Sequence, residues 1–283
     1  MFVSPMLLDK TDKPFDNVQY ITELKLDGIR LILAKFDNKV KLYTRHRNDV
    51  TMKFPELHNI DIPNGTIIDG EIIVPGPNGK PDFEAMMSRY HSKNSLHSIQ
   101  YAVFDVMYYK GKKVTSLPLY ERKKLLSSFL PVSEHVISVQ WIYDNGIAYF
   151  NLVKQNELEG IVLKKADSPY QINKRSSHWL KVINYQFENV SIIGLRKKEF
   201  GLLLGKSNGD KVVPVGIMEF MTPAAKKLLY REYPKWITKE DKQFIYIDPD
   251  KVKCQVRFRN YTKSGKLRIP SFVKYKKLNP LIY

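Results

Sequence analysis

The chain has 283 residues, of which 43% are hydrophobic and 27% are charged, and this globular composition excludes disorder as its main state. Its one cysteine, Cys254, excludes intramolecular disulfides and four-cysteine zinc sites. Lys and Arg exceed Asp and Glu by 46 − 29 = 17, which favours a polyanionic partner, nucleic acid first among them.

No stretch approaches the roughly 20 consecutive apolar residues that a membrane span requires, and the first ten residues lack a secretory pattern. We therefore expect a cytoplasmic protein with no membrane association. The positive charge is uneven: residues 1–188 hold 25 basic and 21 acidic side chains (net +4), whereas residues 189–283 hold 21 and 8 (net +13). This step predicts a larger domain over 1–188 and a small basic domain over 189–283.

The first domain is predicted to be α+β, with mixed antiparallel sheets and helices. A strand pattern over residues 20–36 is interrupted at Asp27-Gly28, a turn signal. Further strands are expected at 40–44, 66–74, 99–106, 136–140, 160–165 and 178–183, and helices at 83–90, 119–129 and 146–156.

The second domain is predicted to be rich in short strands, at 189–195, 202–207, 211–215 and 253–261. One helix is expected over 223–233, where Thr222 is a suitable N-cap and Pro223 a suitable first residue. A small, basic, strand-rich domain is typical of an OB-fold β-barrel.

Lys25 belongs to the hexapeptide Lys25-Leu-Asp27-Gly28-Ile-Arg30, in which one strand meets a turn that leads into the next. A lysine attacks phosphorus only as the neutral amine, so we expect nearby cations, such as Arg30, Lys164 and Lys181, to favour loss of its proton. Taken alone, the hexapeptide is equally compatible with an ordinary hairpin and an exposed lysine.

Five further stretches follow along the chain in order: Tyr43-Thr44-Arg45-His46, Asp69-Gly70-Glu71-Ile72, Tyr101-Ala-Val-Phe104-Asp105, Glu159-Gly160-Ile-Val-Leu-Lys164 and Trp179-Leu180-Lys181. Together with the hexapeptide they resemble the motifs of the covalent nucleotidyltransferases, the superfamily of ligases and capping enzymes. Ser4-Pro5-Met6-Leu7 resembles the start of an ATP-dependent DNA ligase catalytic domain, and residues 261–272 resemble the end of a ligase OB domain. The chain therefore resembles a minimal two-domain ATP-dependent DNA ligase, with a nucleotidyltransferase domain followed by an OB-fold domain.

The resemblance implies that Lys25 attacks the α-phosphorus of ATP and carries AMP, which then passes to the 5′-phosphate of a nick before the 3′-hydroxyl displaces it. By the same resemblance Arg30 and Glu71 would hold the ribose, and Phe104 would stack on adenine. Lys164 and Lys181 would contact the α-phosphate.

Phosphoryl transfer of this kind calls for a divalent cation, Mg²⁺ or Mn²⁺, which the resemblance assigns to Glu159 with help from Glu71 or Asp27. The partner would be nicked duplex DNA. Arg45 is expected to contact the 5′-phosphate of the nick, and the other expected nucleic-acid contacts are Lys174, Arg175 and Arg268. A monomer from a bacterial, phage or viral source is expected.

The chain departs from the family pattern in two places. Ile183 stands where ligases commonly have a second lysine after Lys181, and Lys165 or Lys174 could replace it. The C-terminal Arg-x-Asp-Lys motif, which orients pyrophosphate in the family, has no clean match in residues 271–277.

Three alternatives remain open at this level. Two are enzymes: a capping guanylyltransferase that uses GTP and an RNA ligase. The third is a non-catalytic DNA-binding relative, which would bind duplex DNA without ever becoming labelled by ATP.

Overall fold

The computed structural model describes residues 1–92, 94–209 and 211–278, and the chain divides into two compact units. Unit 1 comprises Met1–Asn184 and unit 2 begins at Tyr185. The boundary predicted from the charge step, between residues 188 and 189, falls inside a strand of unit 2, β12 (Gln186–Arg196). The step in charge places the domain boundary a few residues too late, because the first strand of unit 2 begins with neutral and acidic residues.

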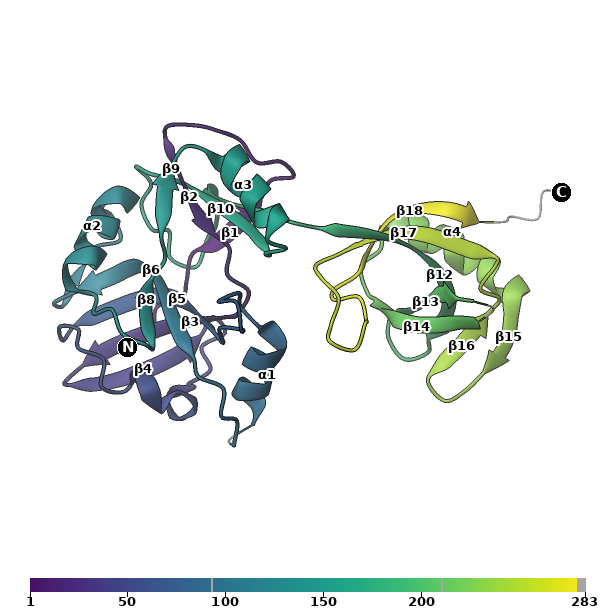
Figure 1. The fold of residues 1–283 in the computed structure, drawn as a ribbon, viewed down its shortest axis with the longest axis horizontal. Coiled ribbons are helices and arrows are strands. Elements are labelled where there is room, and N and C mark those ends of the chain that lie inside the picture. Colours follow the sequence, from purple (N-terminus) through teal and green to yellow (C-terminus); the bar gives the residue numbers. More distant parts are fainter. Residues whose placement is uncertain (93, 210, 279–283) are drawn as a thin grey trace. The chain divides into compact units, whose positions relative to one another are not determined.

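Unit 1 contains two sheets (Figure 1). The six-stranded sheet has the order β4-β3-β5-β6-β7, with β8 paired to β6, and the five-stranded sheet has the order β1-β11-β10-β2-β9. The strands of the first are β3 (Ile29–Phe36), β4 (Lys39–Thr44), β5 (Thr66–Ile73), β6 (Gln100–Tyr109), β7 (Lys112–Lys113) and β8 (Val136–Ser138). The strands of the second are β1 (Leu7–Lys10), β2 (Tyr20–Leu24), β9 (Trp141–Tyr143), β10 (Gly160–Lys165) and β11 (Arg175–Ile183).

Alternation along the strands gives each sheet two buried faces. One face of the six-stranded sheet packs with α1 (Phe83–His91), α2 (Leu119–Phe129) and the short 3₁₀ turns η1 (Thr51–Lys53) and η2 (Pro55–Leu57). The outer face of the five-stranded sheet packs against α3 (Gly146–Gln155), which lies over β2 and β10 in Figure 1.

Between the sheets lies a third hydrophobic cluster, which we call the inter-sheet layer. Ile21 and Trp179 enter it from the five-stranded sheet, and Ile32, Ile67 and Met107 enter it from the six-stranded sheet. All five side chains are fully buried. This layer matters for function because the strands that supply it continue into polar residues at one end.

Unit 2 is built on a seven-stranded sheet with the order β14-β13-β12-β16-β15, in which β17 pairs with both β12 and β18. Its core includes Trp236 and Cys254, and burial raises the pKa of the Cys254 thiol to about 12, so this cysteine is a core residue. Its elements are β12, β13 (Leu202–Asn208), β14 (Lys211–Met218), α4 (Pro223–Glu232), η3 (Tyr233–Trp236), β15 (Ile237–Glu240), β16 (Phe244–Ile247), β17 (Val252–Phe258) and β18 (Ser271–Leu278).

The predicted strands and helices are all present, with ends that shift by a few residues. Helix α4 begins as predicted, since the Thr222 side chain accepts a hydrogen bond from the Ala225 amide. The strands that the sequence pattern missed are β1, β7, β9, β15, β16 and β18. Within the described residues, no helix has the length and apolar character needed to cross a membrane.

Candidate active site

The site lies where the strands around the inter-sheet layer change from apolar to polar residues. On β2 the same face carries Ile21, then Glu23, and just past the strand Lys25. On β3 the corresponding face runs from Ile32 to Arg30, and on β5 it runs from Ile67 through Asp69 to Glu71. Alternation therefore directs these charged side chains to the same side as the shared core.

Lys25 is held by its backbone and by a carboxylate. Its amide donates to the carbonyl of Gly160 at 3.0 Å, which extends the pairing of β2 with β10 by one residue. Its Nζ lies 2.8 Å from Oε2 of Glu159, with only 18% and 5% of the two side chains exposed. The predicted nucleophile and one predicted metal ligand are thus in direct contact.

Gly160 permits this arrangement because β10 passes very close to β11 there. Its φ is +154°, and a Cβ at this position would stand 2.1 Å from the carbonyl oxygen of Val182. No side chain fits in that space. Gly28, in the turn after Lys25, is equally constrained, since a Cβ there would stand 2.2 Å from the carbonyl oxygen of Ile72.

Arg30 forms a fork-to-fork ion pair with Asp69. Its Nε lies 2.9 Å from Oδ1 and its Nη2 lies 2.5 Å from Oδ2. Tyr170 donates its hydroxyl to the same carboxylate at 2.6 Å and accepts the Met6 amide at 3.0 Å. Burial is the largest single influence on Arg30 and lowers its pKa, but Asp69, Tyr170 and Glu71 together outweigh burial and keep the pKa of Arg30 above its ordinary value. Tyr170 is a site residue that the sequence motifs did not predict, and no local signal marks it.

Glu71 lies directly across from Arg30 in the β3/β5 register. Burial raises the pKa of its carboxyl to about 7, and Asp69 and Asp27 add to the rise, while Lys25 and Arg30 oppose it. Among the described residues, no group of three His, Cys, Asp or Glu side chains is arranged to hold a metal ion. The expected set of Glu159, Glu71 and Asp27 is therefore not a preformed three-carboxylate site.

Lys164 is placed differently from the expectation that it contacts a phosphate. Its Nζ lies 2.6 Å from Oε2 of Glu23, and its side chain is 3% exposed. The same Nζ lies 4.4 Å from the centroid of the Phe104 ring and 4.1 Å from that of Trp179. Burial lowers the pKa of Lys164 to about 8, with Glu23 acting in the opposite direction. The charge of Lys164 is therefore paired with a buried carboxylate in this structure.

Glu23 is shared with a second lysine, because Lys123 of α2 also forms an ion pair with it. Both Glu23 and Lys123 are 3% exposed. The partly buried Phe104 ring contacts this group through Lys164 and contacts Arg30 at 5.3 Å. The predicted adenine-stacking residue is therefore in contact with two cations of the site.

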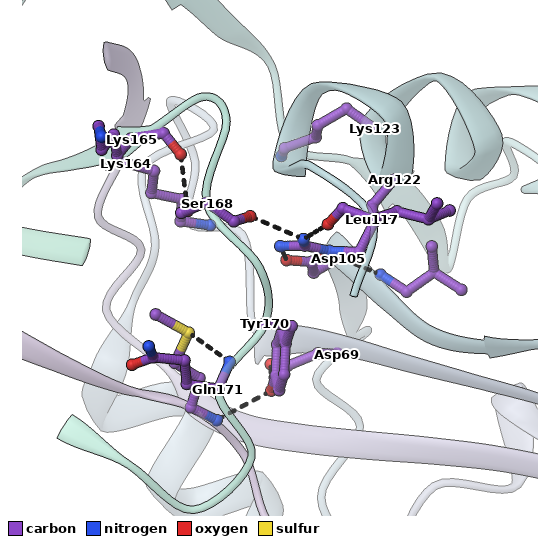
Figure 2. A network of polar contacts seen from close by, with 12 residues as sticks. Asp69, Asp105, Leu117, Arg122, Lys123, Lys164, Lys165, Ser168, Tyr170 and Gln171 are labelled. Carbon is purple, nitrogen blue, oxygen red and sulfur yellow. Dashed lines mark hydrogen bonds and ion pairs between the residues drawn. The ribbon is translucent and has the colours of Figure 1, made fainter. Parts of the chain in front are cut away.

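Beneath these residues, Arg122 and Asp105 form a fully buried pair (Figure 2). The guanidinium donates to Asp105 at 2.8 and 2.9 Å and to the carbonyl oxygens of Leu117 and Ser168 at 2.5 and 2.9 Å. This network ties α2 to β6 and to the segment that carries Tyr170. It is a structural support, since all of its bonds are made within the protein.

Lys181 stands opposite Val162 of β10, on the same face as Lys25. Partial burial lowers its pKa, and so do four cations around it, in order Lys25, Arg175, Arg45 and Lys10. The structure therefore gathers the predicted Arg45 and Arg175 with Lys181 and Lys25, and adds Lys10, which sequence analysis did not select.

The remaining predicted residues are less central. Lys174 is exposed in the turn before β11, and Lys165 lies on the face of β10 that alternates away from Lys164, where it pairs with Asp167 at 3.4 Å. Lys165 is thus no replacement for a lysine at position 183. Arg268 belongs to unit 2, where its Nη1 lies 3.3 Å from Oδ1 of Asn260.

Comparisons with known proteins agree with this geometry. Residues 5–182 match the family model of the ATP dependent DNA ligase domain. The chain is 51% identical over 276 residues to the SPbeta prophage-derived DNA ligase-like protein LigB of Bacillus subtilis (strain 168), with 98% of this chain and 100% of that protein covered. It is 28% identical to a DNA ligase of Methanocorpusculum labreanum, where the match covers 89% of this chain but only 50% of the relative, so this chain spans about half of that protein.

The fold is similar to the solved structure of a mycobacterial DNA ligase D complexed with ATP and MES. The TM-score is 0.59 at 22% identity, over 97% of this chain and 95% of that one. At this identity the likeness concerns the fold alone. The family match over most of the chain, together with the close relationship to the prophage protein, shows that this chain belongs to the family of ATP-dependent DNA ligases.

Proposed function

We propose that this chain seals nicks between a 5′-phosphate and a 3′-hydroxyl in duplex DNA, through AMP bound covalently to Lys25. The observation that carries the proposal is the 2.8 Å contact between the Lys25 Nζ and Glu159, at the end of the inter-sheet layer where Arg30, Glu71 and Phe104 also converge. The complex with ATP stated for the mycobacterial structural relative supports ATP as the donor.

In the first step the Lys25 amine attacks the α-phosphorus of ATP. The new N–P bond forms as the bond from the α-phosphorus to the bridging oxygen breaks, and pyrophosphate leaves with that oxygen. The attacking nitrogen has to lose a proton, and the Glu159 carboxylate is in hydrogen-bond contact to accept it. Lys181, on β11 across β10 from Lys25, is assigned to the α-phosphate, whose charge it would balance.

In the second step an oxygen of the nick 5′-phosphate attacks the same phosphorus and Lys25 leaves as the amine. In the third step the 3′-hydroxyl attacks the 5′-phosphorus and AMP leaves, which closes the strand. We assign Arg45 and Arg175 to the 5′-phosphate, since both are exposed and lie within electrostatic reach of Lys181.

Nucleotide positioning is assigned to the side chains that are already fixed. Asp69 and Tyr170 hold the Arg30 guanidinium, so Arg30 loses little conformational freedom when it contacts the ribose together with Glu71. The Phe104 ring is assigned to the adenine, because it is partly open and bordered by Arg30 and Lys164.

A divalent cation, Mg²⁺ by default, fits this site through one or two carboxylates. Mg²⁺ is usually held by one or two protein carboxylates with substrate phosphates and water, so the lack of a three-carboxylate group in the described residues agrees with a cation that enters with the nucleotide. Glu159 and Glu71 are the carboxylates assigned to it, and its contribution is to neutralise charge on the phosphates. Asp27 is not assigned to the cation; it is a neighbour of Glu71 and raises the pKa of the Glu71 carboxyl.

Unit 2 is assigned to duplex DNA as an OB-type module. Residues 189–283 carry a net charge of +13, and the unit is small and strand-rich. Contacts to phosphates position a protein on DNA without reading sequence, which suits an enzyme that acts at any nick. Arg268 in unit 2 and Lys174 in unit 1 are the further cations assigned to the DNA backbone.

The test is covalent labelling. The protein is incubated with Mg²⁺ and either ATP or GTP labelled at the α-phosphate, and is then separated on a denaturing gel. The wild type should retain label from ATP alone. Lys25→Arg, which keeps the charge beside Glu159 but offers no amine nucleophile, should retain none, whereas Lys13→Ala, at an exposed lysine outside the site, should label like the wild type.

Strand sealing separates the remaining alternatives. A nicked DNA duplex should be sealed by the wild type with ATP, and Lys25→Arg should still close some of a nick that is supplied already adenylylated. Label from GTP alone would indicate a capping enzyme, sealing of RNA in preference to DNA would indicate an RNA ligase, and no label at all would contradict the assigned chemistry.

A further inference from the structure

Five cations of unit 1 lie close enough to interact: Lys181, and around it Lys25, Arg175, Arg45 and Lys10, the last of which pairs with Lys181 in the β1/β11 register. Within the described part of the chain, ion pairs are present for two of them, Lys25 with Glu159 and Lys10 with Asp12. Such an excess of positive charge favours an anion that carries several charges. The proposed function uses every member of this group except Lys10.

The pairing of β1 with β11 places Lys10 beside Lys181. The two strands run parallel, and Lys10 and Lys181 are Cα partners in their register. The Thr11 amide donates a hydrogen bond to the Lys181 carbonyl at 3.1 Å, which continues this pairing by one residue. Partners in a ladder project to the same face, so the row across the sheet is Glu23, Val162, Lys181 and Lys10. Lys10 is therefore on the face that carries Lys25.

Position 183 contributes no charge to this face. Ile183 is the partner of Gly160, next to Lys25, and it is 8% exposed. The strand β1 lies one strand spacing, about 4.8 Å, beyond β11 on the side away from Lys25. A cation on β1 therefore lies beyond Lys181, on the side of Lys181 that is away from Lys25.

That direction suits the leaving group of the first step. In an in-line displacement the attacking nitrogen and the departing oxygen lie on opposite sides of the phosphorus. For an α-phosphate seated between Lys25 and Lys181, the β- and γ-phosphates would extend toward β1. The Lys10 side chain is 40% exposed and its partner Asp12 is 80% exposed, so this surface ion pair exchanges readily for a phosphate.

We propose that Lys10 binds the β- and γ-phosphates of ATP, and therefore pyrophosphate, during transfer of AMP to Lys25. The assignment rests on the proposed function. It gives strand β1 the task of binding pyrophosphate, for which residues 271–277 lack a clean match to the family motif. Lys10 has no part in the later steps, because pyrophosphate has left by then.

The experiment compares Lys10→Ala with Lys13→Ala, which removes a lysine of the same segment that has no ion pair among the described contacts. Three rates are measured: formation of lysyl-AMP against ATP concentration, its reversal against pyrophosphate concentration, and closure of a pre-adenylylated nick. Loss of one charged contact to phosphate should raise the half-saturating concentrations of both ATP and pyrophosphate by about 10- to 100-fold. Closure of the pre-adenylylated nick should stay within about twofold of the wild type, and Lys10→Arg should recover most of the loss.

Equal behaviour of Lys10→Ala and Lys13→Ala in the first two assays would overturn the assignment. So would a parallel loss in closure of the pre-adenylylated nick, since that would place Lys10 at the DNA phosphate or in the general structure of the site. If the wild type itself formed no lysyl-AMP, the proposed function would fail, and the two failures are therefore distinguished in one set of assays.

Discussion

Removal of Arg122 should destabilise unit 1 strongly, because it leaves a buried carboxylate without its counter-ion. Arg122 and Asp105 are both 0% exposed, and Arg122→Met removes two charged hydrogen bonds to Asp105 and two donors to the carbonyls of Leu117 and Ser168. Breaking a buried pair from one side costs about 3–5 kcal/mol of unfolding free energy. For a unit of this size that corresponds to a fall in Tm of about 6–20 °C.

The paired change Asp105→Leu with Arg122→Met should recover part of that loss, since it removes both charges together. The carbonyls of Leu117 and Ser168 still lose a donor and the Val106 amide loses Asp105 as its acceptor, at about 1 kcal/mol each, so the double variant should lie within about 3 kcal/mol of the wild type. Lys41→Met serves as the control, because its ion pair with Asp49 is about half exposed and should contribute less than about 1 kcal/mol.

Urea unfolding followed by tryptophan fluorescence measures these values. In a Trp236→Phe background the remaining tryptophans, Trp141 and Trp179, both report on unit 1. A cost of under about 1 kcal/mol for Arg122→Met, or a double variant no more stable than Arg122→Met alone, would refute the buried-pair reasoning.

Three further predictions concern the site and the DNA. With a pKa of about 7, the Glu71 carboxyl is neutral below that pH and charged above it. The rate of lysyl-AMP formation in the wild type should therefore depend on pH around pH 7, and this dependence should be absent in Glu71→Gln. Identical pH profiles for the two proteins would contradict the assignment. Gly160→Ala should lower the unfolding free energy by about 2 kcal/mol or more and slow lysyl-AMP formation, because the new Cβ would stand 2.1 Å from the Val182 carbonyl oxygen. An unchanged melting temperature would show that β10 can move away from β11. Plots of log affinity for duplex DNA against log salt concentration should be steep, and Arg268→Ala should reduce the slope by about 0.9; an unchanged slope would remove Arg268 from the DNA contacts.

Local pattern was sufficient for the elements whose hydrogen bonds or alternation are set by neighbouring residues. Helix α2 occupies Leu119–Phe129 and strand β10 occupies Gly160–Lys165, as predicted from periodicity. The short strands β1 and β9 were missed, because a few residues carry too little pattern to distinguish a strand from a loop. They become strands only when β11 and β2 offer them an edge.

The role of Lys164 shows the same limit at the level of a side chain. Its motif located it correctly on the site face of β10, but its partner Glu23 comes from β2, and Lys123, from α2, shares that carboxylate. A buried carboxylate attracts whichever cations the packing brings near it. That choice follows from tertiary contacts and leaves no trace in the spacing of the motif.

The amino-acid sequence by itself determined the family of this protein, through a lysine before an Asp-Gly turn and the ordered motifs that follow it, and it showed a strongly basic C-terminal third. Tertiary structure alone decided which charges neutralise one another and which remain available, as in the pairing of Arg30 with Asp69 and Tyr170, and in the arrival of Lys10 beside Lys181. The physical reason is that side-chain identity and local alternation are properties of neighbouring residues. The electrostatic environment of each charge is a sum over strands distant in the chain, whose register is set only when both sheets bury their shared core.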